Sequence, residues 1–77
     1  MELPDGAMVL EPRSTYDKAI IGVTATQAVY DMQKVIEAGI EIFGDYESSL
    51  EWHDYNTFST YVGDQTPIYV DTDIMQG

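Results

Sequence analysis

The chain has 77 residues, enough for one domain, and its fourteen Asp and Glu against three Lys and Arg give a formal net charge of −11. This charge repels nucleic acids and anionic membranes and attracts basic protein surfaces. The chain has no cysteine, which excludes disulfides and cysteine metal sites, while 44% hydrophobic residues predict a folded domain. Without disulfides, a signal peptide or a long apolar run, the protein is expected to be cytoplasmic.

The first half of the chain predicts an arm followed by a β-hairpin. Residues 1–15 contain two prolines and a glycine and are predicted to form an irregular N-terminal arm. Two short β-prone runs, 19–23 and 28–30, flank a polar turn at 24–27. Such an arrangement is typical of a hairpin, although the turn lacks the strong Asn-Gly signal.

A first helix is predicted to begin after Asp31, whose side chain can cap it, and to end at Gly44. Gly39 lies inside this segment and weakens the helix by up to ~1 kcal/mol relative to alanine, which suggests that another backbone approaches closely there. The apolar residues of the segment recur at the spacing of one helical face: Met32, Val35, Ile36, Ile40 and Phe43.

The rest of the chain predicts a second helix and a last strand. The helix is expected over about 45–57, and the strand over 67–70, with Pro67 at its start where the missing N–H removes no sheet hydrogen bond. The order strand, strand, helix, helix, strand predicts one α+β domain over 16–70, a small antiparallel β-sheet with two helices packed on one face. Residues 71–77 are predicted to form a flexible tail. The expected core places Val35, Ile36, Ile40 and Phe43 beneath Ile20, Val29 and Ile68.

The sequence offers little for catalysis or metal binding. Ser48 and Ser49 stand near His53, the single histidine, but hydrolysis would also need an oxyanion hole and a deep pocket. His53 is therefore expected to be packed in the core or in an interface. Residues 54–58 start like a calcium loop but place a phenylalanine where an oxygen ligand is needed, and the acidic pair in 71–73 lacks a second cluster. We expect no catalytic residue, no metal, no cofactor and no enzymatic activity.

Acidic residues gather on the two predicted helices, and no Lys or Arg follows Lys34. Like charges at i, i+4 cost a few tenths of a kcal/mol each, so the fold tolerates some internal repulsion. An ordinary solvated face is the alternative interpretation, although such faces usually mix both signs. The predicted partner-binding residues are Glu37, Glu41, Asp45, Glu47, Glu51 and Asp54.

Their spacing suggests what this surface could bind. Carboxylates at i and i+4 stand about 6 Å apart along a helix axis. Phosphates along one strand of duplex DNA follow at a comparable spacing, about 3.4 Å of axis each with the backbone winding around it. Such a row of carboxylates can occupy a groove of Arg and Lys that is built for nucleic acid.

Short motifs support a more specific hypothesis. They are AIIGV at 19–23, AVYD at 28–31, KVIE at 34–37, EWHDYNT at 51–57, YVG at 61–63 and TPI at 66–68. Together, over roughly residues 16–70, they resemble small acidic phage and mobile-element proteins of the anti-CRISPR type, which inhibit type I systems. The resemblance implies an inhibitor in the host cytoplasm that blocks target DNA recognition by a type I effector complex.

The leading functional hypothesis is therefore a DNA mimic whose partner is the basic protein surface of a nucleic-acid-binding complex, such as a CRISPR effector subunit. Direct binding to nucleic acid or membrane is not expected, and the sequence leaves open whether the protein is a monomer or a homodimer. The alternative is a small regulatory or structural interaction module, an antitoxin or a phage accessory protein, that uses an apolar and tyrosine-rich surface.

Overall fold

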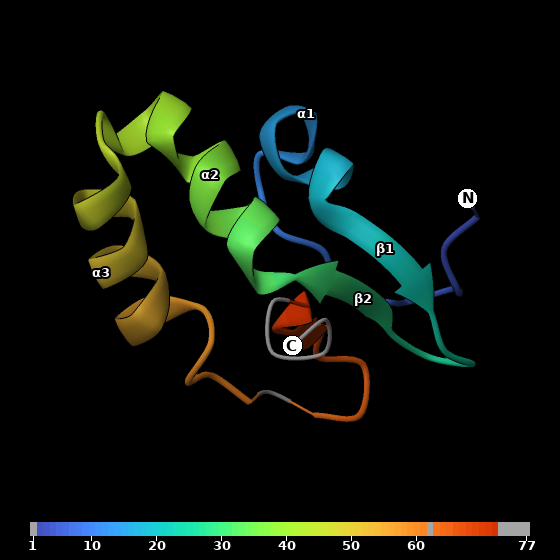
Figure 1. Ribbon diagram of the computed structural model, residues 1–77. Helices are drawn as coiled ribbons and strands as arrows, with labels where there is room; N and C mark the ends of the chain where they lie inside the picture. Colours follow the sequence, from blue (N-terminus) through green and yellow to red (C-terminus); the bar gives the residue numbers. More distant parts are fainter. Residues whose placement is uncertain (1, 62, 73–77) are drawn as a thin grey trace.

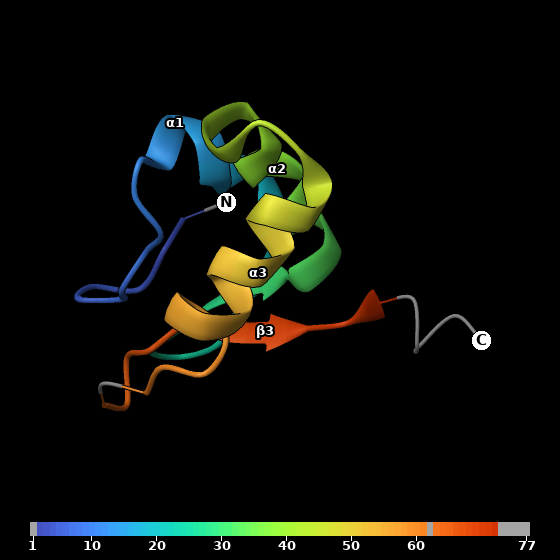
Figure 2. The ribbon, with the colours of Figure 1, turned by 90° about the vertical axis from the view of Figure 1, so that its left-hand side faces the viewer.

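The computed structural model describes residues 2–61 and 63–72. The sheet is flanked by α2, which packs against β2, and α3 packs in turn against α2 (Figures 1 and 2). This confirms the predicted α+β fold class. The elements are α1 (Arg13–Tyr16), the 3-10 helix η1 (Asp17–Ala19), β1 (Ile20–Val23), β2 (Ala28–Asp31), α2 (Met32–Phe43), α3 (Tyr46–Asn56) and β3 (Ile68–Val70).

Strands β1 and β2 form the predicted hairpin. They pair antiparallel, and a register shift between Ile20 and Gly22 marks a bulge in β1. The turn is closed by the Thr24 N–H, which donates to the carbonyl of Gln27 at 2.8 Å. The Thr24 side chain also accepts from the Gln27 N–H at 3.0 Å, so a threonine hydroxyl stabilises this turn without an Asn-Gly pair.

The expectation of a purely antiparallel sheet was wrong, because β3 pairs parallel to β2 and the sheet is mixed. The strand order is β1-β2-β3, with β2 in the centre. Parallel neighbours need a crossover of a dozen or more residues. Here α2, α3 and the loop after them make that crossover, and they return the chain to the end of the sheet where β2 begins.

Both boundaries of α2 lie where the sequence predicted them. The Asp31 carboxylate accepts hydrogen bonds from the backbone N–H groups of Gln33 and Lys34, at 2.9 and 3.3 Å. Gly44 ends the helix with φ 97°, a conformation that favours glycine, and its N–H donates to the Ile40 carbonyl. The other carboxylate oxygen of Asp31 accepts from the Thr72 hydroxyl at 2.8 Å. Of the predicted tail, residues 73–77 lie outside the described part.

Residues 2–15 are more ordered than an irregular arm. They contain the start of α1, a short helix that the sequence did not predict. The N–H of Met8 donates to the Gln65 carbonyl at 3.1 Å, and the N–H of Leu10 donates to the Tyr30 hydroxyl at 2.9 Å. Leu3 and Leu10 pack against the core. The arm is therefore joined to β2 and to the loop before β3.

The core lies between the arm, the sheet and α2. Ile20 packs against it and Val35 is fully buried within it, as predicted. The strand residues facing it are Ala28, Tyr30 and Tyr69, whereas Val29 and Ile68, expected there, pair with each other one residue out of phase. Successive side chains of a strand point to opposite faces, so an error of one residue reverses the face. The buried cluster consists of Tyr16, Ala19, Ala28, Tyr30, Val35 and Ala38.

Ile36 provides a test of this packing. It is 5% exposed, but it lies beside the main cluster rather than inside it. Ile36→Ala is therefore expected to lower the free energy of unfolding by about 2 kcal/mol, the lower end for a buried aliphatic truncation. Urea denaturation followed by circular dichroism measures the change. Ile42→Ala, on the same helix at an exposed position, is the control and should change stability by less than about 0.5 kcal/mol. An equally small change for Ile36→Ala would place this residue outside the packed interior.

Candidate functional site

The outer side of α3 presents four carboxylates, which we call the α3 acidic surface: Asp45, Glu47, Glu51 and Asp54. All four residues are exposed. Asp45 is the N-cap of the helix, and its carboxylate accepts from the Ser48 N–H at 2.7 Å. The hydrogen bonds from the backbone and side chain of Ser48 lower the pKa of Asp45. The remaining three follow at helical spacing, so these three form a row along one side of α3, and Asp45 lies at the N-terminal end of the helix.

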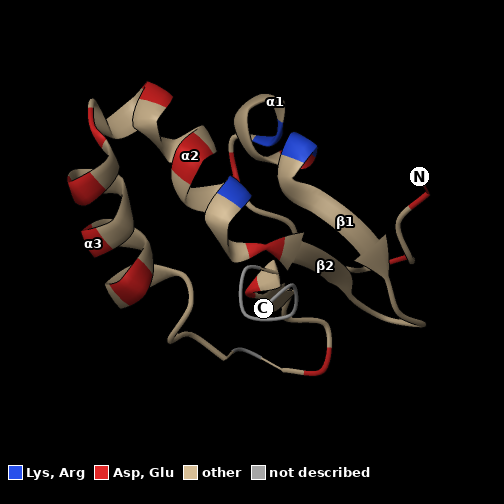
Figure 3. Cartoon of the chain, in the orientation of Figure 1, with Lys and Arg blue, Asp and Glu red and all other residues tan. Residues whose placement is uncertain are grey.

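No cation of the described residues forms an ion pair with the α3 acidic surface. Arg13 pairs with Asp17 at 3.0 Å, and Lys18 pairs with Glu41 at 3.9 Å. Figure 3 shows the basic residues in blue at α1, η1 and α2, whereas α3 carries red acidic residues and no blue one. The helix therefore displays negative charge without local compensation.

The six predicted partner-binding residues are divided between α2 and α3 with its N-cap, and their surroundings differ. Glu37 and Glu41 lie on α2, where Glu41 accepts from the Thr15 hydroxyl at 3.2 Å and pairs with Lys18. Glu37 lines a shallow depression together with Lys18 and Lys34. The α2 pair is thus placed among cations, and only the other four make up the α3 acidic surface. Lys18 is distant from Glu41 in sequence, which is why the sequence did not show this compensation.

Aromatic side chains accompany the carboxylates of α3. Tyr46 and Trp52 are partly exposed, and Tyr55 is 83% exposed. Tyrosine and tryptophan are enriched in protein interfaces, because they combine a large apolar area with a polar group. α3 therefore exposes both charge and aromatic surface.

α3 contacts α2 through a small polar residue as well as through the rings of Trp52 and Phe43. Ser49 is buried, and its hydroxyl donates to the Ile36 carbonyl at 2.7 Å. Opposite it, a Cβ on Gly39 would collide with the Ser49 hydroxyl oxygen. Gly39 does lie at a close approach, but the atoms that approach it belong to side chains, those of Ser49, His53 and Tyr16, and not to another backbone as the sequence suggested. The Ser49 hydroxyl hydrogen is directed to α2 rather than to His53.

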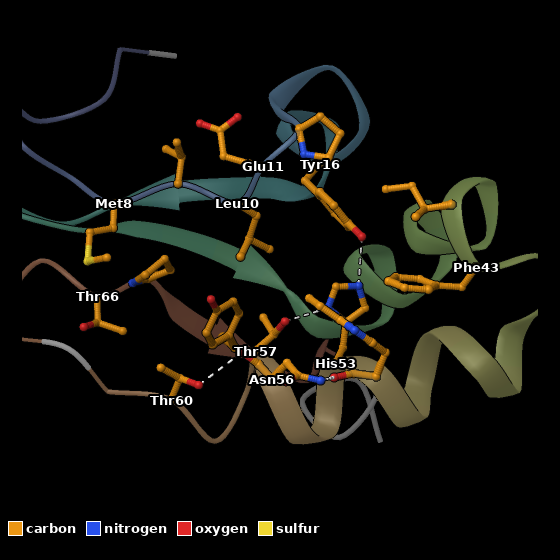
Figure 4. A pocket seen from close by; sticks show the side chains of 16 residues that line it. Met8, Leu10, Glu11, Tyr16, Phe43, His53, Asn56, Thr57, Thr60 and Thr66 are labelled. Atoms are coloured by element: carbon orange, nitrogen blue, oxygen red, sulfur yellow. Dashed lines mark hydrogen bonds between the residues drawn. The ribbon is translucent and has the colours of Figure 1, made fainter.

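His53 is packed in the interior, as the sequence predicted. It is 1% exposed, its Nε2 lies 3.0 Å from the Tyr16 hydroxyl and its Nδ1 lies 2.7 Å from the Thr57 hydroxyl (Figure 4). The rings of Phe43 and Trp52 meet it edge-on, with centroids 5.8 and 5.1 Å away. Burial lowers the pKa of His53, so the neutral form is favoured.

Above this histidine lies a pocket of about 420 Å³ (Figure 4). Its walls come from the arm, the end of α2, α3 with the turn after it, and β3 with the residues before it. They are mostly apolar and aromatic, and include Met8, Leu10, Phe43, Trp52 and Tyr69. Sequence reasoning missed the pocket because no single segment forms it. The local signal was the apolar run at residues 8–10 of the arm, which indicated that the arm packs against an apolar surface elsewhere in the protein.

No protein-family model matches the chain, and neither does any curated protein or solved structure. Over residues 2–61 and 63–72, no cluster of three or more His, Asp or Glu could hold a metal ion. In the same ranges no helix has the length and apolar character needed to cross a membrane. Of the predicted acidic pair in 71–73, Asp73 lies outside the described residues.

Proposed function

We propose that the protein is an inhibitor that binds, through the α3 acidic surface, the basic nucleic-acid-binding surface of another protein or complex. The observation that carries this proposal is the row of exposed carboxylates on α3 without a paired Lys or Arg among the described residues. Solvated helix faces usually carry both signs, and the α2 face of this same protein does. The contrast between the two helices favours a binding role for α3.

The physical basis is competition for cations. A groove that binds nucleic acid holds Arg and Lys at the spacing of phosphates, and nucleic acid that binds there releases the counterions condensed on it. Carboxylates repeating about every 6 Å along a helix can engage several of those cations at once. A net charge of −11 also raises the association rate with a basic surface, and more so at low salt.

The sequence resemblance narrows the choice of partner. It makes a type I CRISPR effector complex in the host cytoplasm the first partner to test, with target DNA recognition as the step that is blocked. In this form the protein is an anti-CRISPR inhibitor that needs no cofactor and has no enzymatic activity.

Charge reversal on α3 tests the proposal. Glu47→Lys combined with Glu51→Lys is expected to weaken binding at least about tenfold, because it adds repulsion as well as removing attraction. The stability of the domain should stay close to that of the wild type. The two lysines repel each other as the two glutamates did, but the charge at position 51 becomes opposite to that of Asp54, three residues on. Displacement of fluorescent target DNA from a type I effector complex, read by anisotropy at low and at physiological salt, measures the effect.

The α2 pair supplies a matched control. Glu37→Lys combined with Glu41→Lys changes the net charge equally and at the same helical spacing, but on the face that already contains Lys18 and Lys34. Its effect on displacement should stay within about threefold if the contact is local to α3. Equal displacement by the wild type and the α3 variant would make the α3 acidic surface only a solvated face, and would refute the proposal.

The exposed aromatics support a second candidate, the interaction module that is recognised through an apolar and tyrosine-rich surface. Tyr55 and Tyr61 are 83% and 73% exposed. Salt separates the two functions, since a charge-led complex weakens steeply with ionic strength and an apolar one hardly does.

A further inference from the structure

The pocket above His53 has the size and walls of a site for an apolar group. Its volume of about 420 Å³ falls within the usual range for small-ligand sites, about 300–1,000 Å³. Phe43 and Trp52 stack with their ring centroids 5.0 Å apart and form one wall. Leu10 of the arm and Tyr69 of β3 also line it. An aromatic or branched aliphatic side chain would be enclosed by apolar surface on several sides.

Most of the polar side chains that line the pocket are already hydrogen-bonded within the protein. The hydroxyls of Tyr16 and Thr57 are bonded to the two ring nitrogens of His53. At the mouth, the Asn56 amide donates to the Trp52 carbonyl, and the Thr60 hydroxyl donates to the Asn56 carbonyl. Over the described residues no buried side-chain nitrogen or oxygen lacks a partner. A polar ligand group would find few free hydrogen-bonding partners there, so the pocket favours an apolar group.

The charge around the pocket excludes anions. Glu11 is the single charged residue among the described residues of its wall. A second, more open hollow of about 380 Å³ is lined by the same two rings with Ser48 and Glu51. Fatty acids, nucleotides and acidic peptides would be repelled by these carboxylates and by the net charge of −11. A neutral apolar group with cations beside it fits both the walls and the charge.

We propose that this pocket is an anchor site that takes one aromatic or aliphatic side chain from a basic segment of the partner protein. Trp52 joins the two parts of the surface, because it lines the pocket and also the hollow that contains Glu51. Lys or Arg residues that flank the anchor side chain then reach the α3 acidic surface. That the partner segment is basic rests on the proposed function. That the anchor side chain is apolar rests on the pocket alone. The anchor side chain would also fix the position of the partner along α3, because charge pairs alone allow several alignments.

Two peptides test the anchor site directly: Ac-Lys-Lys-Phe-Lys-Lys-NH2 and the same peptide with alanine in place of phenylalanine. The fluorescence of Trp52, the single tryptophan, reports binding from the pocket wall. The phenylalanine peptide is expected to bind at least about tenfold more tightly, from the apolar area that it buries. Added salt should weaken the binding of both peptides and leave the ratio of their dissociation constants unchanged. NOEs between the peptide phenylalanine ring and the side chains of Trp52 and Leu10 should place the ring in the pocket.

A pair of neighbouring variants supplies the control. Thr60→Phe puts a ring at the mouth of the pocket and should abolish the preference for phenylalanine over alanine. Ser59→Phe adds the same ring at the preceding exposed residue, which does not line the pocket. Like the Thr60 hydroxyl, the Ser59 hydroxyl donates to the carbonyl four residues earlier. Ser59→Phe should keep the preference. Circular dichroism establishes that each variant is folded, and the wild-type NOEs decide the matter if Thr60→Phe does not fold.

The outcomes separate the anchor site from the proposed function. Equal affinity for the two peptides, equal effects of the two ring variants, or NOEs outside the pocket would overturn the anchor site and leave the charge-based function standing. Glu47→Lys with Glu51→Lys should weaken the binding of both peptides by the same factor and so keep the ratio of their affinities. If that variant changes neither affinity while the ratio persists, the anchor site holds and the proposed function fails.

Discussion

Gly39→Ala is expected to lower the free energy of unfolding by about 3 kcal/mol, even though alanine is the better helix former. A Cβ at this position would collide with the Ser49 hydroxyl oxygen and would stand 3.0 Å from Nε2 of His53. The helices must then separate or the hydrogen bonds of these two side chains must break, and either change costs free energy in a close-packed interior. Urea denaturation of the wild type and the variant measures the loss.

Two further variants show whether the close helix contact is the cause. Removing the hydroxyl in the double variant Gly39→Ala with Ser49→Ala should recover part of the loss, with a coupling of about 1 kcal/mol or more. Gly22→Ala is the matched control, because the nearest side-chain atom to a Cβ there is 3.9 Å away, an ordinary contact. It should change stability by less than about 0.5 kcal/mol. A Gly39→Ala variant as stable as the wild type would mean that α2 and α3 are not tightly packed at this residue.

Local chemistry explains why the helices and the hairpin could be predicted. Asp31 caps α2 through its own side chain, and Gly44 supplies the positive φ that ends it. Both signals act within a few residues, so they are visible in the sequence. The direction of β3 has no such local signal. It depends on the path of the chain through α3 and the loop that follows, and on which face of the sheet each strand turns to the core.

The candidate site divides in the same way. The carboxylates of α3 follow from helical spacing alone, and their exposure agrees with it. The neutralisation of Glu41 depends on Lys18, which η1 brings to α2 from a distant part of the chain. The pocket is formed by segments that are distant in sequence. His53 beside it is hydrogen-bonded to Tyr16, the last residue of α1, and to Thr57 after α3. Tertiary contacts of this kind leave no periodic pattern in a sequence.

His53→Ala is expected to cost about 3–5 kcal/mol of unfolding free energy. The substitution removes a large buried side chain and leaves the hydroxyls of Tyr16 and Thr57 without their partner. For a domain of this size such a loss is a large part of its total stability. His53→Gln keeps hydrogen-bonding groups in place and should cost less. If the partner binds through α3 and the pocket mouth, the folded glutamine variant should retain binding within a few-fold.

The pH dependence of stability identifies the role of His53 more specifically. Its folded-state pKa lies below the ordinary value of about 6.5, because burial disfavours the charged ring. As the pH falls below about 6.5, the unfolded chain gains a proton that the folded protein does not take up, so stability falls by up to about 1.4 kcal/mol per pH unit until the folded ring titrates. Above that pH the contribution is fully present. The wild type and His53→Gln share every carboxylate, so the difference between their unfolding free energies isolates the histidine. That difference should shrink as the pH is lowered from 8 to 5, and a constant difference would show that burial does not control the charge of His53.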